Sequence, residues 1–481
     1  MQLSSLSGYV NGVSRVIFTV LNRLYSQDTG MSKQIKIRKG VDIRLVGTPL
    51  DTISVAGRSK TYAIQPSDYE GLTPKLKVKE GDDVKAGSTL FYDKKMDSVQ
   101  YVSPVSGTVK AIVRGDKRRI LAVVVEADAS DSYHEFGAID LQGASRQDIL
   151  NKVLEGGMFP CFRQRPFDVV ANPSDIPRSI HVSGFDSSPL AARTSVCLEG
   201  RLNDFQNGIN VLSVLAGEGG VHLGVKVGDS TLSNVSGCSI TEFNGPHPSG
   251  NVGVQIHHTS PINKGEVVWT IGYQDVANLG AFLSSGKYIP IKVVAIGGSE
   301  SPVTGHVISL AGAEISSLVD VPNSNDVRII SGSPFTGDKV EATGYVGAFH
   351  TAVAMIPEGH ESRFLLSNGW LSLGLDRFSL SKSYFSWLRP KSKEYTLDTN
   401  LGGEERAFVV TGEYEKYFPF DIYPVHLLKS ILVNDIDSME KLGIYEVSPE
   451  DFALCEYACT SKIPVQQIVR EGLDTLRNEL G

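Results

Sequence analysis

The fold of the N-terminal part of the chain is decided by the stretch Pro74-Lys-Leu-Lys-Val-Lys-Glu-Gly-Asp-Asp-Val-Lys-Ala-Gly-Ser-Thr-Leu90. Leu76 and Val78 alternate with lysines, and this period of two predicts a half-buried strand. Gly81-Asp82 and Ala86-Gly87 are typical of turns, so the strands here are short. The stretch therefore indicates a compact all-β module.

The next stretch, Asp93-Lys-Lys-Met-Asp-Ser-Val-Gln-Tyr-Val-Ser-Pro-Val-Ser-Gly-Thr-Val109, resembles the hairpin of biotinyl and lipoyl carrier domains. Those carriers place their acceptor lysine eight residues before the proline, where this chain has Met96. Lys95 lies one place away, and a slip of one residue moves a strand side chain to the other face. Residues 31–130 are therefore predicted to form a barrel-sandwich-like β domain that has lost the attachment. A carrier modified at Lys94 or Lys95 is the alternative.

Composition and charge narrow the class of protein. The 481 residues are 41% hydrophobic and 21% charged, with a formal net charge of −8. This length predicts several domains, and the acidic balance argues against nucleic-acid binding. No run approaches the roughly 20 apolar residues that a membrane span needs. The five cysteines are scattered rather than arranged as a disulfide framework, which favours a reducing compartment.

Helical spacing appears in the middle of the chain. Ile149, Leu150 and Val153 predict a helix that begins after Ser145 and ends at Gly156-Gly157. Strand-like runs follow, and then a helix. These segments are residues 179–184, 221–227 and 267–273 for the strands and 275–283 for the helix. Their alternation predicts a Rossmann-like α/β domain over residues 131–288.

The remaining segments complete a multidomain fold of α/β and α+β type. Short strands around one possible helix, at 314–318, predict a β-grasp-like domain over residues 289–360. Residues 361–481 are expected to end in a helical bundle, because two apolar stripes recur there at helical spacing. The stripes are Leu427, Leu428, Ile431 and Leu432, then Val465, Ile468, Val469, Leu473 and Leu476. Residues 1–30 are expected to be an extension, disordered or forming one short helix.

The densest turn-forming stretch is Gly245-Pro-His247-Pro-Ser-Gly250-Asn-Val-Gly253. Glycines allow a ring to approach the backbone closely, but the prolines remove N–H donors that a phosphate cradle would use. His257-His258 and Gly272-Tyr273-Gln-Asp275 follow it. We interpret this cluster as a binding or interface site. Histidines that are merely hydrogen-bonded within the fold are the alternative.

Two arginines lie beside aromatic residues in Phe162-Arg163-Gln-Arg165-Pro-Phe167. They could hold an anion or a carbonyl-bearing ring, or they could pair with surface carboxylates. The chain has no Gly-x-Ser-x-Gly, His-Glu-x-x-His or kinase motif, so hydrolase and phosphoryl-transfer functions gain no support.

Cys455 and Cys459 have the spacing that places two thiols on one helix face. An iron–sulfur cluster or closed zinc site needs four ligands, and the other cysteines lie singly and far away in the sequence. A structural role is therefore favoured over metal binding.

Several motifs together resemble the A-subunit family of the sodium-translocating NADH:quinone reductases, in the same order from about residue 33 to the end. They are Ile37-Arg-Lys-Gly-Val-Asp-Ile43, Phe162-Arg-Gln-Arg-Pro-Phe167, Phe185-Asp-Ser-Ser-Pro-Leu-Ala191, Gly245-Pro-His-Pro-Ser-Gly250, Gly272-Tyr-Gln-Asp-Val276, Ser331-Gly-Ser-Pro-Phe-Thr-Gly337, and Ser448-Pro-Glu-Asp-Phe-Ala-Leu-Cys455 followed by Cys459.

That family is similar in architecture to the flavin-bearing NADH-binding subunit of respiratory complex I. Such relatives carry a glycine-rich flavin loop after the first helix and a C-terminal run of cysteines. Here the loop contains Met158, Phe159 and Phe162, and only Cys455 and Cys459 remain of the run. The resemblance therefore implies a scaffold that lost flavin and cluster, with the two cysteines vestigial.

The resemblance implies a peripheral subunit on the cytoplasmic face of the bacterial inner membrane, in a complex that oxidises NADH, reduces ubiquinone or menaquinone and exports Na⁺. Flavins and iron–sulfur centres would belong to the membrane partners B to F, chiefly B and possibly C, and this chain alone would not be catalytic. Its expected quinone or partner surface consists of Arg163, Arg165, Phe167, His247, His257, His258, Tyr273 and Asp275. A domain that retains flavin or NAD chemistry is the alternative.

Overall fold

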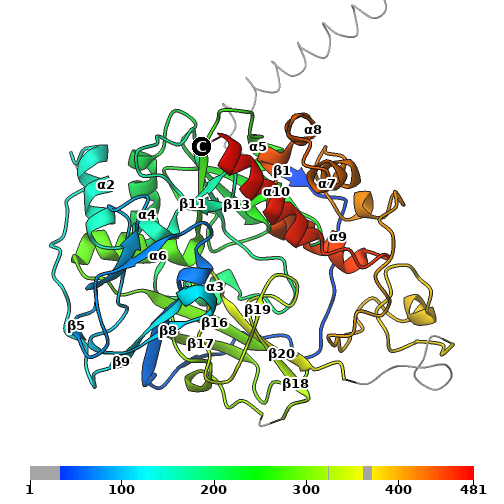
Figure 1. Ribbon diagram of the computed structural model, residues 1–481, viewed down its shortest axis with the longest axis horizontal. Helices are drawn as coiled ribbons and strands as arrows, with labels where there is room; N and C mark the ends of the chain where they lie inside the picture. The colour runs from blue at the N-terminus through cyan, green and yellow to red at the C-terminus, as the bar shows by residue number, and fades with distance from the viewer. Residues whose placement is uncertain (1–32, 142, 323, 361–370, 481) are drawn as a thin grey trace, which may run out of the picture.

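The computed structural model describes residues 33–141, 143–322, 324–360 and 371–480. Figure 1 shows a β-rich unit built from the blue and cyan segments, a central sheet with helices, a third sheet, and C-terminal helices to the right. The extension expected at residues 1–30 lies outside the described residues. Among the helices that are described, none is both long and apolar enough to cross a membrane.

The first unit consists of two antiparallel sheets that share one apolar core. Leu90, Val109 and Val123 come from different strands and are fully buried in this core. The first sheet has the strand order β3 (Thr61–Ile64), β9 (Ile120–Ala127), β8 (Gly107–Arg114) and β5 (Asp83–Val84). The second has the order β4 (Pro74–Leu76), β6 (Thr89–Asp93) and β7 (Gln100–Val102).

The hairpin that resembles a carrier domain connects β6 to β7. Lys94 and Lys95 are exposed in its turn, whereas Met96 is half-buried and packs against the core. The residue in the acceptor position therefore supports packing and does not project as an attachment arm would. Short 3₁₀ turns η1 (Pro66–Asp68) and η2 (Asp116–Arg118) complete this unit.

The central sheet is mostly parallel. Its order is β1 (Lys33–Lys36), β14 (Ser239–Asn244), β13 (Val221–Lys226), β12 (Ile180–Ser183), β15 (Val268–Gly272), β10 (Arg163–Arg165) and β11 (Val169–Val170). The five strands from β1 to β15 run parallel, and β10 pairs antiparallel with β15. The short helix α3 (Thr194–Cys197) follows β12 along the chain.

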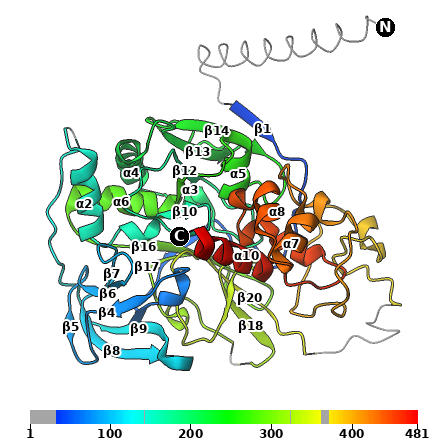
Figure 2. The same ribbon diagram turned by 45° about the horizontal axis from the view of Figure 1, so that its top comes forward.

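Helices cover both faces of the central sheet. Figure 2 shows α4 (Leu202–Leu215) and α6 (Tyr273–Ser285) on one side and α5 (Val252–Thr259) on the other. Apolar side chains of α4 and α6 join the main core, while Val254 of α5 joins the core of the C-terminal region. As predicted, α2 (Arg146–Glu155) begins after Ser145, whose hydroxyl accepts from the Asp148 N–H, and ends at Gly156.

The third sheet has the order β19 (Asp338–Val340), β18 (Val327–Ser331), β20 (Ala352–Pro357), β16 (Ile291–Gly297), β17 (Gly305–Leu310) and β2 (Ile53–Val55). The helix expected at residues 314–318 is a single 3₁₀ turn, η4 (Ile315–Ser317). A helical turn thus lies where it was expected, but it is of 3₁₀ type, because a segment of five residues is too short to nucleate an α-helix.

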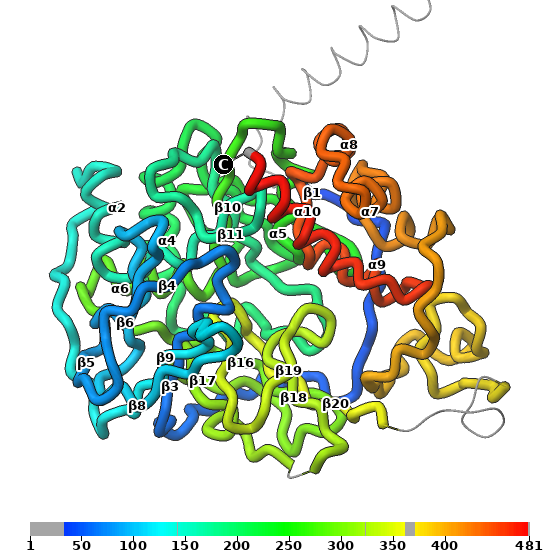
Figure 3. The backbone as a smooth tube through the Cα atoms, in the orientation of Figure 1, coloured from blue at the N-terminus to red at the C-terminus, as the bar shows by residue number. Residues whose placement is uncertain are grey.

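The N-terminal segment joins three units. β1 pairs with β14 of the central sheet, and β2 pairs with β17 of the third sheet. Figure 3 follows this segment in blue from β1, past the C-terminal helices, to the third sheet. Both strands lie within residues 31–130, the predicted first domain, but their partners belong to other sheets. Strand partners are set by distant residues, which the local alternation of apolar and polar residues does not reveal.

The described part of the C-terminal region, from residue 371, is irregular at first and then helical. It contains η5 (Phe385–Leu388), η6 (Tyr414–Lys416), α7 (Pro424–Leu432), α8 (Ile436–Lys441), η7 (Ile444–Glu446), η8 (Pro449–Phe452), α9 (Ala453–Ala458) and α10 (Val465–Leu480). The apolar stripe predicted in α10 is buried. Leu432 is 53% exposed, against the prediction, because it occupies the last position of α7.

Candidate functional site

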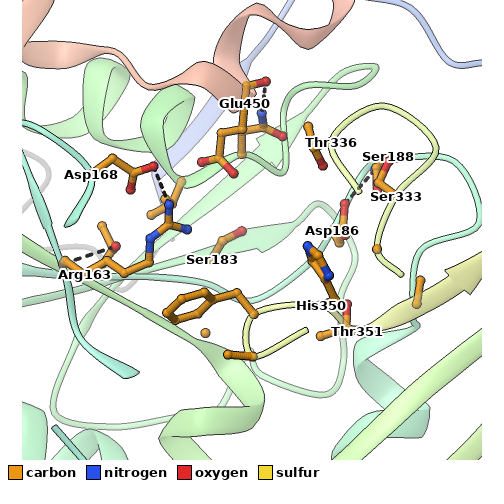
Figure 4. A pocket seen from close by; sticks show the side chains of 18 of the residues that line it. Arg163, Asp168, Ser183, Asp186, Ser188, Ser333, Thr336, His350, Thr351 and Glu450 are labelled. Carbon is orange, nitrogen blue, oxygen red and sulfur yellow. Dashed lines mark hydrogen bonds and ion pairs between the residues drawn. The ribbon is translucent and has the colours of Figure 1, made fainter. Parts of the chain in front are cut away.

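A cavity of about 480 Å³ lies where the central sheet, the third sheet and the C-terminal region meet. Ser183 and Gly272, the last residues of β12 and β15, line it, so it lies at the carboxyl edge of parallel strands. Ligands of open α/β sheets bind at this edge, and the volume is in the usual range for small molecules. Figure 4 shows the side chains that converge there.

One wall of the cavity combines a cation with an aromatic ring. The Arg163 guanidinium is ion-paired with Asp168 and lies 5.0 Å from the centre of the Phe349 ring. Arg163 comes from β10, whereas Phe349 precedes β20 of the third sheet. A planar ligand could stack or accept hydrogen bonds here.

His247 lines the cavity from the loop after β14. Its Nδ1 lies 3.0 Å from the Ser187 hydroxyl, and its ring stacks on Phe335 with centroids 5.7 Å apart. The backbone N–H of His247 donates to Asp42 at 2.9 Å. Burial lowers the pKa of this imidazole to about 4, so the ring is neutral at physiological pH.

Lys292, Asp275 and Asp68 also line the cavity. Lys292, from β16, donates to the Ala348 carbonyl at 2.7 Å. Burial raises the pKa of Asp275, which Lys292 and Arg201 partly oppose. Burial also raises the pKa of Asp68, to about 6. The Tyr273 hydroxyl donates to the Cys197 thiol at 3.4 Å. Protonatable groups therefore lie beside the space that a ligand would fill.

Arg165 lies behind the cavity wall, only 1% exposed, among three carboxylates. Its guanidinium nitrogens lie 2.8 Å from Glu450, 3.3 Å from Asp451 and 3.4 Å from Asp168. Asp451 also accepts the Ser448 N–H at 2.9 Å. Burial raises the pKa of Glu450 to about 7, an effect that Arg165 opposes. The cluster joins β10 to η8 of the C-terminal region.

The eight residues proposed from the sequence do not share one surface. Arg163, His247, Tyr273 and Asp275 line the cavity. The other four lie at the contact between the central domain and the C-terminal region. Arg165 lies in its carboxylate cluster, and Phe167 packs against the C-terminal core. His257 accepts the Asp421 N–H at 3.0 Å, its other ring nitrogen lies 2.7 Å from Glu446, and the ring of His258 lies 5.1 Å from that of His257.

Lys292 and His350 also line the cavity, and neither is among the residues predicted from the sequence. A signal for Lys292 was present, because it is the one charged residue in the apolar run Ile291-Lys-Val-Val-Ala-Ile296. His350 follows Gly347-Ala-Phe, which has no comparable signal. Glu450 and Asp186 lie within the motifs quoted from the sequence, but no role was predicted for them.

Bulky apolar side chains crowd the loop after α2. Met158, Phe159 and Phe162 are buried there. The rings of Phe159 and Phe162 each lie 5.5 Å from that of Trp269 in β15. Gly157, Met158, Pro160 and Cys161 line a second cavity of about 70 Å³, far below the volume of a site for a small ligand, so the residues present do not fit a flavin.

Both C-terminal cysteines are buried within the C-terminal core. The Cys459 thiol accepts from the Tyr414 hydroxyl at 2.9 Å, and the Cys455 thiol lies 3.8 Å from the Tyr414 carbonyl. Within the ranges that the structure describes, no three His, Cys, Asp or Glu side chains are grouped as metal ligands.

These features define a multidomain α/β protein with a polar small-molecule cavity at the carboxyl edge of its central sheet. Family models match residues 35–128 as the NqrA N-terminal barrel-sandwich hybrid domain, 144–288 as the NqrA second alpha/beta domain, and 293–342 as the NQRA C-terminal domain. The predicted N-terminal barrel-sandwich and central α/β domains are thereby confirmed at this coarse level.

Curated relatives agree with the family models. The A subunit of the Na(+)-translocating NADH-quinone reductase from Cellvibrio japonicus is 36% identical over 451 residues, covering 92% of this chain and 100% of the relative. That of Yersinia pestis bv. Antiqua is 34% identical over 450 residues, with the same coverage. The chain belongs to the family of Na⁺-translocating NADH-quinone reductase A subunits, which confirms the resemblance.

A solved NAD⁺-reducing [NiFe]-hydrogenase chain is also similar. It is 10% identical and has a TM-score of 0.33, with 45% of this chain and 48% of that chain covered. A TM-score this low supports no statement about function.

Arg165→Met should lower the free energy of unfolding by about 3–5 kcal/mol, because Asp451 would remain fully buried without its cation and Asp168 would keep only Arg163. Arg193→Met is the matched control. Arg193 pairs with Asp51 at the surface, where both side chains are at least half exposed, and its loss should cost under about 1 kcal/mol. Urea unfolding of both variants measures the difference. Equal shifts would show that the buried cluster carries no special stability.

The neutral histidines predict a pH dependence of stability. His247 and His350 both have pKa values lowered by burial from 6.5 to about 4. Between these values the unfolded chain binds protons that the folded chain does not, so stability should fall as the pH falls from 6.5 to about 4.

The loss should be at most about 1.4 kcal/mol per imidazole for each pH unit. Urea unfolding at several pH values measures it in the wild type and in the double variant His247→Gln/His350→Gln. Subtracting one profile from the other removes the contribution of the buried carboxyls. Parallel profiles would contradict the assignment of this pH dependence to His247 and His350.

Proposed function

We propose that this chain is the peripheral A subunit of a complex that oxidises NADH, reduces ubiquinone or menaquinone and exports Na⁺, and that its cavity holds the quinone ring. Family membership supports the complex. The observation that carries the quinone assignment is the cavity itself, where aromatic rings and neutral or cationic hydrogen-bond donors meet at the carboxyl edge of the sheet.

A quinone ring is flat and neutral, and its two carbonyls accept hydrogen bonds. Phe335 and Phe349 offer ring faces or edges in the cavity lining. His247 can donate without placing a charge against the neutral ring, whereas Arg163 can supply a positive charge as electrons arrive. Sites for small ligands typically combine such apolar walls with a few placed polar groups.

Reduction of a quinone to a quinol takes up two electrons and two protons. In this proposal the electrons come from flavins and iron–sulfur centres of the partner subunits. Among cavity-lining groups, Asp275 and Glu450 have pKa values raised by burial, to about 7 for Glu450. Carboxyls of this kind hold a proton near neutral pH and can pass it to an oxygen that becomes basic on reduction.

We infer that the central domain is a Rossmann-like scaffold that no longer holds a flavin, followed by a β-grasp-like domain and a helical bundle. The buried rings of Phe159, Phe162 and Trp269 support the loss of flavin, because they fill the loop after α2. The same observation weighs against the alternative, a domain that retains flavin or NAD chemistry of its own.

Docking on membrane subunits, chiefly B and possibly C, at the cytoplasmic face is supported by large apolar side chains that the C-terminal region exposes. Monomers rarely expose many large apolar side chains close together. Exposed ones concentrate between residues 371 and 433 in this chain. They are Leu371, Leu373, Phe385, Trp387, Leu388, Leu401, Val409, Val410, Tyr423, Leu432 and Val433.

Replacing His247 by Ala should weaken the binding of a quinone-site inhibitor to the assembled complex by about tenfold, the effect of one lost hydrogen bond to a ligand oxygen. Inhibitor titration of NADH-driven quinone reduction measures this. His134→Ala is the control, because His134 is exposed in the first unit, away from the cavity lining. Normal assembly with unchanged inhibition would contradict the assignment.

The double variant Trp387→Ser/Leu388→Ser should fold normally but lose most co-purification with the membrane subunits. These side chains are 55% and 63% exposed, so their loss costs little stability and removes apolar contact area. The control is Ile176→Ser/Val303→Ser, with exposures of 66% and 56% outside the C-terminal region. Affinity purification of tagged complex compares them. Equal recovery of the membrane subunits with both double variants would exclude these side chains as the docking site.

A further inference from the structure

A second histidine, His350, lines the same cavity from the opposite domain (Figure 4). It lies in the loop before β20 of the third sheet, whereas His247 follows β14 of the central sheet. His350 has the same kind of partner as His247, since its Nδ1 lies 3.0 Å from the Ser331 hydroxyl. Each histidine therefore forms a pair with a serine of its own domain.

In the first pair, the Ser187 hydroxyl oxygen accepts the Gly250 N–H at 2.8 Å and lies 3.0 Å from His247 Nδ1. Its single hydrogen has no other acceptor among the described residues. A hydroxyl that accepts from the backbone on one side is best satisfied by donating on the other. Nδ1 of His247 therefore accepts, and in the neutral ring the proton must be on Nε2.

The second pair repeats this arrangement. The Ser331 hydroxyl accepts the Gly347 N–H at 3.0 Å and lies 3.0 Å from His350 Nδ1, again with no other acceptor in the described chain. Glycines shape the seat of the ring. A Cβ at Gly347 would lie 2.4 Å from His350 Nδ1, and one at Gly332 would lie 2.9 Å from its Cδ2. The seat thus requires residues without side chains.

Each ring therefore has Nδ1 occupied by a serine and Nε2 available as a donor. Burial lowers both pKa values to about 4, which keeps the rings neutral and each serine donating. No hydrogen-bond partner of either Nε2 is present among the described residues. These pairs are unlike a hydrolytic dyad, in which the serine binds Nε2 and a carboxylate binds Nδ1.

We propose that His247 and His350 present matched Nε2–H donors, one from each domain, to the two oxygens of a single para-quinone ring. This inference rests on the proposed function and adds the second donor and the two serines that orient the donors. Ser187 and Ser331 are positioning residues, since they act through the rings. Donors at both oxygens also stabilise the negative charge that the ring gains on reduction.

Two substitutions of His350 separate the donor from the rest of the ring. In His350→Gln the side-chain amide reaches the place of Nε2 and can still donate, whereas in His350→Asn it reaches only the place of Nδ1. Ubiquinone-1 is titrated into the purified full-length chain and into the assembled complex. We expect Gln to bind within about threefold of the wild type and Asn about tenfold more weakly, the worth of one hydrogen bond.

The dimethyl ether of the corresponding quinol is the matched probe, because its oxygens are poor acceptors. It should bind weakly and equally to wild type, His350→Gln and His350→Asn. The same pair of substitutions at His247 should reproduce the pattern. Equal ubiquinone-1 affinity for Gln and Asn at either position would overturn the proposal.

The tautomer has a readout that does not depend on any ligand. Nitrogen-15 NMR of histidine-labelled chain should show Nε2 protonated and Nδ1 unprotonated for both rings, and Ser331→Ala should allow the other tautomer at His350. Protonated Nδ1 in the wild type would overturn the orientation by serine. If the wild type binds ubiquinone-1 but the Gln and Asn variants bind it with equal affinity, this inference fails and the proposed function stands. If wild type binds none in the chain or the complex, both fail.

Discussion

The guanidinium of Arg165 lies buried among Asp168, Glu450 and Asp451, and this cluster holds the C-terminal region against the central sheet. A buried cation and buried carboxylates each lose their hydration, so the arrangement persists only if all members are in place. Asp168 also pairs with Arg163 at the cavity, and Glu450 lines the cavity itself. The geometry of the site therefore depends on a contact between residues about 285 positions apart.

The cavity is built by several domains together. Ser183 and Gly272 end strands of the central sheet, His350 belongs to the third sheet, and Glu450 belongs to the C-terminal region. The N-terminal segment reinforces this junction, since β1 and β2 pair with different sheets and Asp42 between them accepts the His247 N–H. Relative movement of the domains would change the spacing of the polar groups, which couples ligand binding to the packing of the whole chain.

Local patterns predicted the elements well and the site only in part. The two ends of α2, at Ser145 and Gly156, were predictable because capping depends on neighbouring residues. The burial of α10 was predictable because its apolar residues recur at every helical turn. Arg163 and Arg165 lie two residues apart on the same strand and between the same two aromatic residues, yet one lines the cavity and the other is buried. Their difference comes from Glu450 and Asp451, which cover only the second. No local signal contains that information, and the same holds for the strand partners of β1 and β2.

The two possible ligand positions on the central domain make opposite demands on the chain. A cofactor with phosphates needs open backbone N–H groups and space, and after α2 the rings of Phe159 and Phe162 pack against Trp269 beside a cavity of only about 70 Å³. A small neutral ring needs no phosphate seat. It needs side-chain donors of fixed direction, and His247 and His350 supply these because burial keeps the imidazoles neutral while serines fix their hydrogens. The apolar packing after α2 and the oriented donors of the larger cavity therefore both favour the proposed ring site over a flavin site.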